Sequence, residues 1–276
     1  MFLTTADGTA LRVEWALPGG RSHRTFRARS ADGSVVLVKT DGDPAGLTHE
    51  FAVLQGLAAA GFPAPLPLAL TRIPTIGGRW RLALLLSWVD GTVPNGTAAW
   101  RRLGARLAQL HRLPPVPGVP VRLSMTVADL PGSVRSAVGE RRAMQMMTAA
   151  SPGDELVLSH GDAGPENFLD HPDGGSLIDF EATCRQPAGA DLGRCLFLLT
   201  DAGRSPSDAG AALLAGYGAG ALPVPELFGW AAREGLRVAV WRRRHAGRPG
   251  VPDWRRAVAT ALRCWSQASL REAPAC

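Results

Sequence analysis

Cysteine is scarce, and the four cysteines do not have the spacing of metal ligands. They stand at positions 184, 195, 264 and 276 of a 276-residue chain, so the paired cysteines of a zinc site are excluded. We expect free thiols in a reducing cytoplasm. Long apolar runs are also missing: the longest, 82–89, is interrupted by Ser87 and is too short to cross a bilayer. Because the first residues do not resemble a signal peptide, the sequence predicts a cytoplasmic protein that does not bind a membrane.

Lysine is almost absent. Of 30 basic residues, 29 are arginine and one is Lys39, which ends the apolar segment 34–39. The two residue types are not interchangeable, because the lysine ammonium is a compact point charge on a flexible stem. At the end of a strand it can reach the α- and β-phosphates of a nucleotide. Glu50, in a segment of helical periodicity over 47–57, is placed to hold it; an ordinary solvated pair is the alternative.

Asparagine is equally rare, since only Asn95 and Asn167 occur. Asn167 lies five residues after Asp162 in the segment 160–167, which reads His-Gly-Asp-Ala-Gly-Pro-Glu-Asn. Asp179 follows the next apolar run, so these polar groups stand where two predicted strands, 155–159 and 176–178, end. Phosphoryl transfer needs a carboxylate base, and an amide and a second carboxylate to hold Mg²⁺. We predict Asp162 as the base and Asn167 and Asp179 as Mg²⁺ ligands; simple turn-forming residues are the alternative.

A glycine-rich turn precedes the lysine segment. Residues 18–22 separate two alternating segments, 10–17 and 25–29, which predict paired strands. The backbone at Gly20 and the hydroxyl of Ser22 can face phosphate oxygens. The same Gly-Gly sequence also joins ordinary hairpins.

Together these motifs resemble the aminoglycoside phosphotransferase and choline kinase-like family of small-molecule kinases. The resemblance covers the segments around Lys39, Glu50, Gly20 to Ser22, 84–91, 160–167 and 178–181. It implies an α+β, two-lobed protein-kinase-like fold. A small mixed β/α lobe over 1–90 would bind ATP, and a larger, mainly helical lobe over 91–276 would carry catalysis and bind the acceptor.

Two further roles follow from the resemblance alone. The segment 84–91 is similar to the family's interlobe hinge, whose backbone reads the adenine, so Ser87 and Val89 would supply those groups. The segment Asp191-Leu192-Gly193 is similar to the family's Asp-Leu-Ala element, in which an aspartate opens a helix near the catalytic loop. The chain departs from the family at Gly164, where a second histidine is usual, and at Glu166, where a small residue is common. These departures leave the base and the metal ligands in place.

The C-terminal part reads as helical. Helices are predicted over 98–112, within 126–150, and near 189–201, 207–217, 225–246 and 252–270. The methionines at 144, 146 and 147, and most of the tryptophans at 230, 241, 254 and 265, are expected in the core. The resemblance places the acceptor site among these C-terminal helices.

Charge gives a hypothesis about the acceptor. Residues 186–276 contain 12 basic and 7 acidic residues, out of a net charge of +6 for the whole chain. Like charge opposes binding of a polycation, so a neutral or anionic hydroxylated acceptor is favoured, with Arg237, Arg242 or Arg244 as candidate contacts. A solvated helix face is the alternative, and acidic residues could still cluster locally. No nucleic-acid partner is expected despite a sequence pI near 10, because no groove-reading motif is present.

The sequence therefore predicts an ATP- and Mg²⁺-dependent O-phosphotransferase that acts on a hydroxyl of a small molecule. An antibiotic, such as a nucleoside-type compound, is the favoured acceptor. The alternatives are a kinase of primary metabolism, of choline, thiamine or homoserine type, and a kinase-fold binding module without catalysis.

Overall fold

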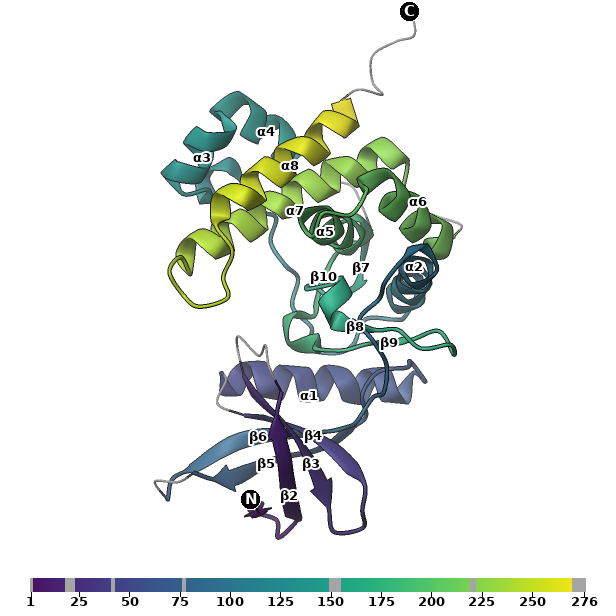
Figure 1. Ribbon diagram of the computed structural model, residues 1–276, viewed down its shortest axis with the longest axis vertical. Helices are drawn as coiled ribbons and strands as arrows, with labels where there is room; N and C mark the ends of the chain where they lie inside the picture. The colour runs from purple at the N-terminus through teal and green to yellow at the C-terminus, as the bar shows by residue number, and fades with distance from the viewer. Residues whose placement is uncertain are drawn as a thin grey trace, which may run out of the picture.

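A curled antiparallel sheet forms the first part of the molecule. The computed structural model describes residues 2–17, 23–40, 43–75, 78–148, 155–218 and 222–269. The sheet has the strand order β1-β2-β3-β4-β6-β5, and α1 lies between it and the helical part (Figure 1). The strands are β1 Phe2–Thr4, β2 Ala10–Ala16, β3 Arg24–Ser30, β4 Val35–Thr40, β5 Pro67–Pro74 and β6 Trp80–Ser87.

Alternation along β4 decides where Lys39 lies. Val36 and Val38 belong to a small apolar cluster on one face of the sheet. Because successive side chains in a strand point to opposite faces, Lys39 lies on the other face. That face carries Leu84, its cross-strand partner on β6, which packs in the main core with residues of α1.

Helix α1, Pro44–Ala59, begins with strong start signals. The side chain of Asp43 accepts a hydrogen bond from the Ala45 N–H, and Pro44 occupies the first helical position. The buried residues recur at helical spacing and include Leu47, Glu50 and Leu54. Glu50 therefore shares the buried face of the helix with leucines.

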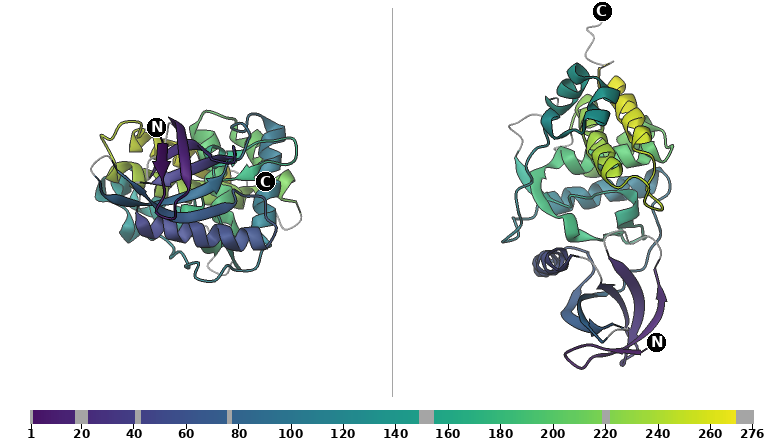
Figure 2. Two further views of the ribbon diagram at one scale, coloured as in Figure 1. Left: turned by 90° about the horizontal axis from the view of Figure 1, so that it is seen from below. Right: turned by 90° about the vertical axis from the view of Figure 1, so that its left-hand side faces the viewer.

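The second part is mainly helical (Figure 2). Its helices are α2 Thr97–His111, α3 Gly132–Val138, α4 Glu140–Thr148, α5 Ala188–Asp201, α6 Pro206–Tyr217, α7 Val224–Arg244 and α8 Trp254–Ser269. Its short strands are β7 Leu156–Ser159, β8 Phe168–Leu169, β9 Ser176–Leu177 and β10 Cys184–Pro187, and its single 3₁₀ turns are η1 Val127–Asp129, η2 Pro165–Asn167 and η3 Phe180–Ala182. Strands β7 and β10 pair, as do β8 and β9, which places the segment 160–167 and Asp179 at the strand ends.

The predicted fold class is confirmed: the molecule is α+β, with a small sheet-containing part and a larger helical part. The predicted lobe boundary at 90/91 lies between β6 and α2 and stays a prediction. The helix expected within 126–150 is present as α4, and a second helix, α3, precedes it, separated from it by Gly139, which adopts φ +85°. Met144 is 53% exposed, so its placement in the core was wrong, whereas Met146 and Met147 are buried.

The described part of the chain contains three of the four cysteines. Cys184, Cys195 and Cys264 are buried free thiols, and burial raises the pKa of Cys184 to about 11. No helix there has the length and apolarity needed to cross a membrane.

Candidate active site

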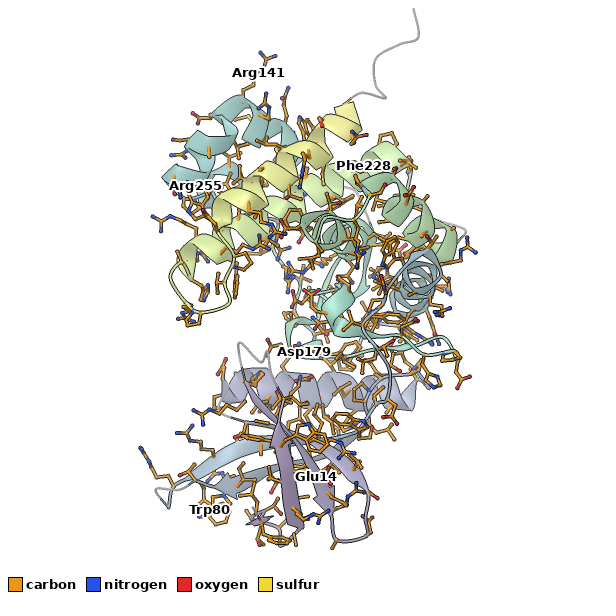
Figure 3. All side chains as sticks on the ribbon, in the orientation of Figure 1. Glu14, Trp80, Arg141, Asp179, Phe228 and Arg255 are labelled. Atoms are coloured by element: carbon orange, nitrogen blue, oxygen red, sulfur yellow. The ribbon has the colours of Figure 1, made fainter. Side chains whose placement is uncertain are left out.

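Lys39, Glu50 and Asp179 form one charged cluster. The Lys39 Nζ lies 2.7 Å and 2.9 Å from the two carboxylate oxygens of Glu50 and 2.8 Å from Oδ1 of Asp179. Strand β4, helix α1 and the turn before η3 supply these groups. Asp179 lies where the sheet-containing and helical parts meet (Figure 3). The predicted Lys39–Glu50 pair is therefore present, and Asp179 joins it.

The three groups differ in burial and in charge preference. Burial would lower the pKa of Lys39, but the charges of Glu50 and Asp179 outweigh it and raise that pKa. The pKa of Glu50 is raised, chiefly by burial. Burial also acts to raise the pKa of Asp179, but Lys39 outweighs it and brings that pKa below its usual value. The side chain of Asp179 is 36% exposed while that of Glu50 is fully buried, so Asp179 is the accessible carboxylate.

The segment 160–167 places Asp162 and Asn167 side by side. The Asn167 Nδ2 donates to the main-chain oxygen of Asp162 at 2.9 Å and approaches its Oδ2 at 3.3 Å. His160 Nδ1 accepts from the Asp162 N–H at 3.3 Å, and its Nε2 donates to the Ile178 carbonyl at 2.9 Å. These two contacts require a neutral imidazole with its proton on Nε2. His160 thus ties the segment to the strand that leads to Asp179.

The carboxylate of Asp191 binds the backbone at the start of the same segment. Its Oδ2 accepts from the His160 N–H at 2.7 Å and its Oδ1 from the Gly161 N–H at 3.0 Å. His111 Nε2 lies 3.1 Å from Oδ2, and His111 Nδ1 lies 2.9 Å from the Tyr217 hydroxyl. Burial acts to raise the pKa of Asp191, but the hydrogen bond and charge of His111, with further donors, hold that pKa well below its usual value. Asp191 therefore lies beside the segment 160–167, the position that the resemblance implied for the aspartate at the start of this helix.

Two arginines complete the arrangement, and the sequence pattern did not single them out. Arg122 donates to the carbonyls of Gly161 and Ala182, both at 2.7 Å, and so joins the segment before Asp162 to the turn after Asp179. Arg194 of α5 forms an ion pair with Asp162. The only sequence signal for Arg194 was its position three residues after Asp191. Nothing in the sequence distinguished Arg122 from the other arginines, of which the chain has 29 in total.

The predicted hinge residues lie at the end of β6. The Ser87 N–H donates to the Leu66 carbonyl at 2.9 Å, and its hydroxyl accepts from the Leu66 N–H at 2.8 Å. Only the carbonyl of Ser87 is therefore a candidate for reading a base. Within the described part of the chain, the Val89 N–H forms no hydrogen bond. Adenine reading by Ser87 and Val89 stays a prediction, and Gly20 and Ser22 lie outside the described residues.

An arginine–tryptophan stack adjoins this hinge. The Arg27 guanidinium carbon lies 4.6 Å from the ring centroid of Trp15 and 5.1 Å from that of Trp88. Arg27 pairs in register with Leu37 of β4, two residues from Lys39, so it shares the face on which Lys39 lies. These cation–π contacts join β2 and β3 to the segment that follows β6.

The departure at Gly164 has a steric basis. A Cβ atom at this position would lie 2.6 Å from Leu198 Cδ1 and 2.9 Å from Glu166 Oε2. A histidine at 164 would therefore require the side chains of Leu198 and Glu166 to move.

The predicted acceptor contacts on α7 separate into three cases. Arg242 is buried and donates to Asp201 Oδ2 at 2.7 Å, so its prediction as an acceptor contact was wrong: its charge is used inside the helical core. Arg244 is exposed near the end of α7. Arg237 lines a small pocket with Glu234, to which it donates at 3.1 Å.

The oxygen groups present fit a hard divalent cation. Asp179 offers an accessible carboxylate of low pKa, and Asn167 keeps its Oδ1 as a ligand atom because Nδ2 is used in binding Asp162. Mg²⁺ accepts a few protein oxygens and takes the rest from phosphates and water. No cluster of three or more His, Cys, Asp or Glu side chains that could bind a metal without such help occurs in the described ranges.

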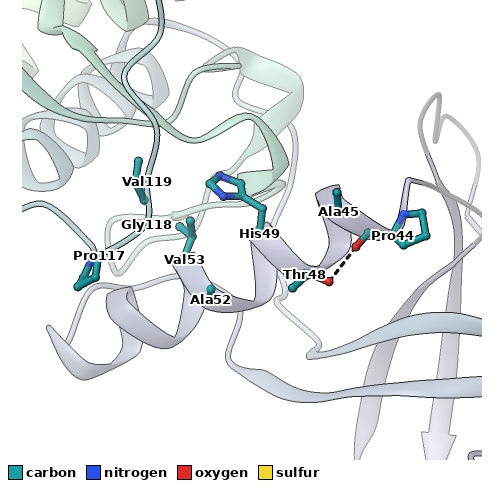
Figure 4. A pocket seen from close by; sticks show the side chains of 9 residues that line it. All are labelled: Pro44, Ala45, Thr48, His49, Ala52, Val53, Pro117, Gly118 and Val119. Atoms are coloured by element: carbon teal, nitrogen blue, oxygen red, sulfur yellow. Dashed lines mark hydrogen bonds between the residues drawn. The ribbon is translucent and has the colours of Figure 1, made fainter.

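A larger groove lies away from these residues. It has a volume of about 480 Å³ and runs between α1 and the loop at Pro117 to Val119 (Figure 4). Its lining is mostly apolar and includes His49, whose Nε2 lies 2.9 Å from the Thr183 carbonyl. None of the predicted site residues lines it.

Comparison with known proteins identifies the family. The chain is 28% identical over 240 residues to a homoserine kinase of Azorhizobium caulinodans, an alignment that covers 78% of this chain and 74% of that protein. Its fold is similar to that of a choline/ethanolamine kinase family protein from Mesorhizobium loti (TM-score 0.66, 20% identity, 93% and 87% of the two chains). It is also similar to that of an amicoumacin kinase in complex with AMP-PNP, Ca²⁺ and Ami (TM-score 0.66, 12% identity, 95% and 88%).

A family-wide comparison is decisive because it covers most of the chain, from the strand before the glycine-rich turn to the middle of α7. The phosphotransferase enzyme family matches residues 15–236. This range contains the residues predicted as the base, the metal ligands and the nucleotide contacts, but not the candidate acceptor contacts Arg237, Arg242 and Arg244. The chain belongs to the phosphotransferase enzyme family and is a small-molecule kinase with a protein-kinase-like fold.

Proposed function

We propose that the protein transfers the γ-phosphate of ATP to a hydroxyl of a small molecule in a Mg²⁺-dependent reaction. The observation that carries this proposal is the convergence of Lys39, Asp179 and the neighbouring pair Asp162 and Asn167, from three separate segments, onto one site. Lys39, held by Glu50, is assigned to the α- and β-phosphates. Asp179 and Asn167 are assigned to Mg²⁺, which would neutralise charge on the phosphates.

Asp162 is assigned as the base. It accepts the proton of the acceptor hydroxyl as the oxygen of that hydroxyl bonds to the γ-phosphorus; the bond from the γ-phosphorus to the bridging oxygen breaks and ADP leaves. Arg194 and Asn167 orient the Asp162 carboxylate. The backbone at Ser87 and Val89 is assigned to the adenine, and that at Gly20 and Ser22 to the phosphates.

Two classes of acceptor have support. Excess positive charge in residues 186–276 favours a neutral or anionic antibiotic, such as a nucleoside-type compound, over a polycation. The similarity to a homoserine kinase favours a hydroxylated amino acid and hence a role in primary metabolism. Both classes keep the same base, metal ligands and nucleotide site.

ADP release measured with ATP, Mg²⁺ and an acceptor panel tests the proposal. The panel contains homoserine, choline, a nucleoside antibiotic and kanamycin as a polycation. Asp162→Asn should lower kcat by roughly 10²- to 10⁴-fold on any accepted compound, the range for loss of a general base, with little change in nucleotide affinity. Asp208→Asn, an exposed change on α6, is the control. Near-normal turnover by Asp162→Asn at saturating substrate would refute the assignment of the base.

A further inference from the structure

A small positively charged pocket borders the catalytic segment. It lies between the start of α5, the middle of α7 and the segment 122–125, and its volume is about 20 Å³. It therefore has room for one functional group, not for a molecular scaffold. Its charged and aromatic lining residues are Arg122, Trp230, Arg233, Glu234 and Arg237. Three arginines against one glutamate give this lining an excess of two positive charges.

Arg233 lacks an anionic partner in direct contact. It is 7% exposed, and within the described part of the chain its guanidinium makes no hydrogen bond or ion pair. Its carbon lies 5.1 Å from the ring centroid of Trp230, and burial lowers its pKa. A buried charge without a hydrogen-bonded counter-ion is unfavourable. The adjacent Glu234 already accepts from Arg237 at 3.1 Å.

The start of a helix also favours an anion in the pocket. Pro187 and Ala190, which line the pocket, belong to the start of the 14-residue helix α5. The first N–H groups of a helix are unsatisfied within it and attract negative charge. A buried guanidinium and a helix N-terminus therefore border the same small space.

The pocket is joined to the catalytic base. Arg122, which lines it, donates to the carbonyl of Gly161, the residue immediately before Asp162. Glu234, which also lines it, interacts electrostatically with Arg194, the ion-pair partner of Asp162. Two residues that line the pocket thus act on the segment that contains Asp162 or on its ion-pair partner.

We propose that this pocket binds a carboxylate of the acceptor, so that the substrate is a small hydroxylated carboxylic acid. The planar guanidinium of Arg233 matches a carboxylate geometrically and provides charge-assisted hydrogen bonds. This inference rests on the proposed function, because it places the acceptor hydroxyl at Asp162.

Calorimetric binding to the full, nucleotide-free chain tests the pocket independently of catalysis. Three acids are compared with their own amides: L-homoserine, glycerate and 4-hydroxybutyrate. At least one acid should bind about 10- to 100-fold more tightly than its amide, as expected for hydrogen bonds between charged groups. Inorganic phosphate is titrated as a second anion. Tighter binding of phosphate than of all three acids would overturn the assignment to a carboxylate.

Arg233→Met is the diagnostic variant, and Arg243→Met, on the exposed face of the same helix, is its control. Arg233→Met should abolish the preference for acid over amide. Its melting temperature without ligand should equal or exceed that of the wild type, since an unpaired buried charge is removed. Arg243→Met should keep the preference. Equal binding of acid and amide in the wild type, an unchanged preference in Arg233→Met, or a melting temperature several degrees lower would each overturn the proposal.

Kinetics separate this inference from the proposed function. If phosphotransfer is absent, no acceptor yields ADP, yet the acid–amide comparison still reports on the pocket. If phosphotransfer occurs and amides are phosphorylated as efficiently as acids, the carboxylate site alone is wrong. With an accepted acid, Arg233→Met should lower kcat/KM for that acid and leave the KM for ATP unchanged.

Discussion

Asp179 has a backbone conformation that few residues other than glycine adopt. Its φ is 66° and its ψ is 68°, and no other non-glycine residue of the described ranges has a positive φ. This left-handed region is unfavourable for L-residues, although aspartate tolerates it better than most. Such conformations persist where the surroundings impose them. Here Lys39 binds the Asp179 carboxylate, and the next N–H, that of Phe180, donates to Glu50 at 3.1 Å.

The two proposed metal ligands should respond differently to removal. Asp179→Ala should abolish Mg²⁺-dependent turnover, because the accessible charged ligand is lost. Asn167→Ala should retain activity but raise the Mg²⁺ concentration needed for half-maximal rate, because a neutral amide contributes less. ADP release over a Mg²⁺ titration measures both, with Asp208→Ala on the exposed face of α6 as the control. Identical Mg²⁺ titrations for both ligand variants and the wild type would contradict the metal assignment.

Residues with unusual local sequence could be predicted, whereas residues with ordinary sequence could not. Lys39 stood out as the one lysine, and Asn167 as one of two asparagines, and each lies in the predicted cluster or segment. Arg122 and Arg194 make contacts of equal importance, but their partners are far away in the chain. Such contacts depend on how β10 and α5 pack, which a local pattern does not contain.

Helices α2 and α6 approach each other at two glycines. A Cβ atom at Gly104 of α2 would lie 2.1 Å from the Leu213 carbonyl oxygen, and one at Gly216 of α6 would lie 1.8 Å from the Arg101 carbonyl oxygen. Each glycine thus faces the backbone of the partner helix, which cannot rotate away as a side chain could. This close packing brings Tyr217, at the end of α6, to His111, at the end of α2, which in turn contacts Asp191.

Gly104→Ala should therefore destabilise the protein, although alanine is the better helix former. Overpacking typically costs about 1–3 kcal/mol, so we expect the melting temperature to fall by roughly 2–10 °C for a chain of this size. Gly46→Ala in α1 is the matched control, because its nearest neighbour would be 4.0 Å away; its melting temperature should be unchanged or slightly higher. Equal melting temperatures for the two variants in differential scanning calorimetry would show that α2 and α6 can separate at little cost.

Strands and helices were predicted correctly where the spacing of apolar residues and the residues at the ends of the segment indicated the same structure. The strand that ends at Lys39 and the helix that contains Glu50 were both expected, and α1 has an aspartate cap and an initial proline. The region 126–150 contains the expected helix as α4, but the second helix, α3, and the break between them at Gly139 were not predicted. The segment 160–167 was singled out by its motif. The resemblance implied that Asp191 lies near it, but not the hydrogen bonds from the His160 and Gly161 N–H groups to the Asp191 carboxylate.

At the scale of the whole molecule, the contacts between the two parts converge on residues 179–183. Asp179 binds Lys39, Thr183 binds His49, and Glu181 pairs with His23. The turn that contains Asp179, a proposed Mg²⁺ ligand, therefore also connects the sheet-containing part to the helical part. The net charge of residues 186–276 overstates the positive charge that is available to a ligand. Asp201 forms ion pairs with both Arg242 and Arg256, so only part of the positive excess remains.

Stability at acid pH should depend on Asp191, because this buried carboxylate links α2, α5 and the catalytic segment. Its pKa is depressed in the folded protein, whereas in the unfolded chain it is near the ordinary value of about 4. A depressed folded pKa stabilises the protein above that unfolded value, and the stabilisation is lost as the pH falls below it. Asp191→Asn should therefore be least stable relative to the wild type near neutral pH, and the difference should shrink below about pH 4. Urea unfolding from pH 7 to pH 3 measures this, with Asp208→Asn controlling for net charge. A difference between wild type and Asp191→Asn that stays constant over this range would show that Asp191 supports the fold through its shape and hydrogen bonds alone, without a contribution from its charge.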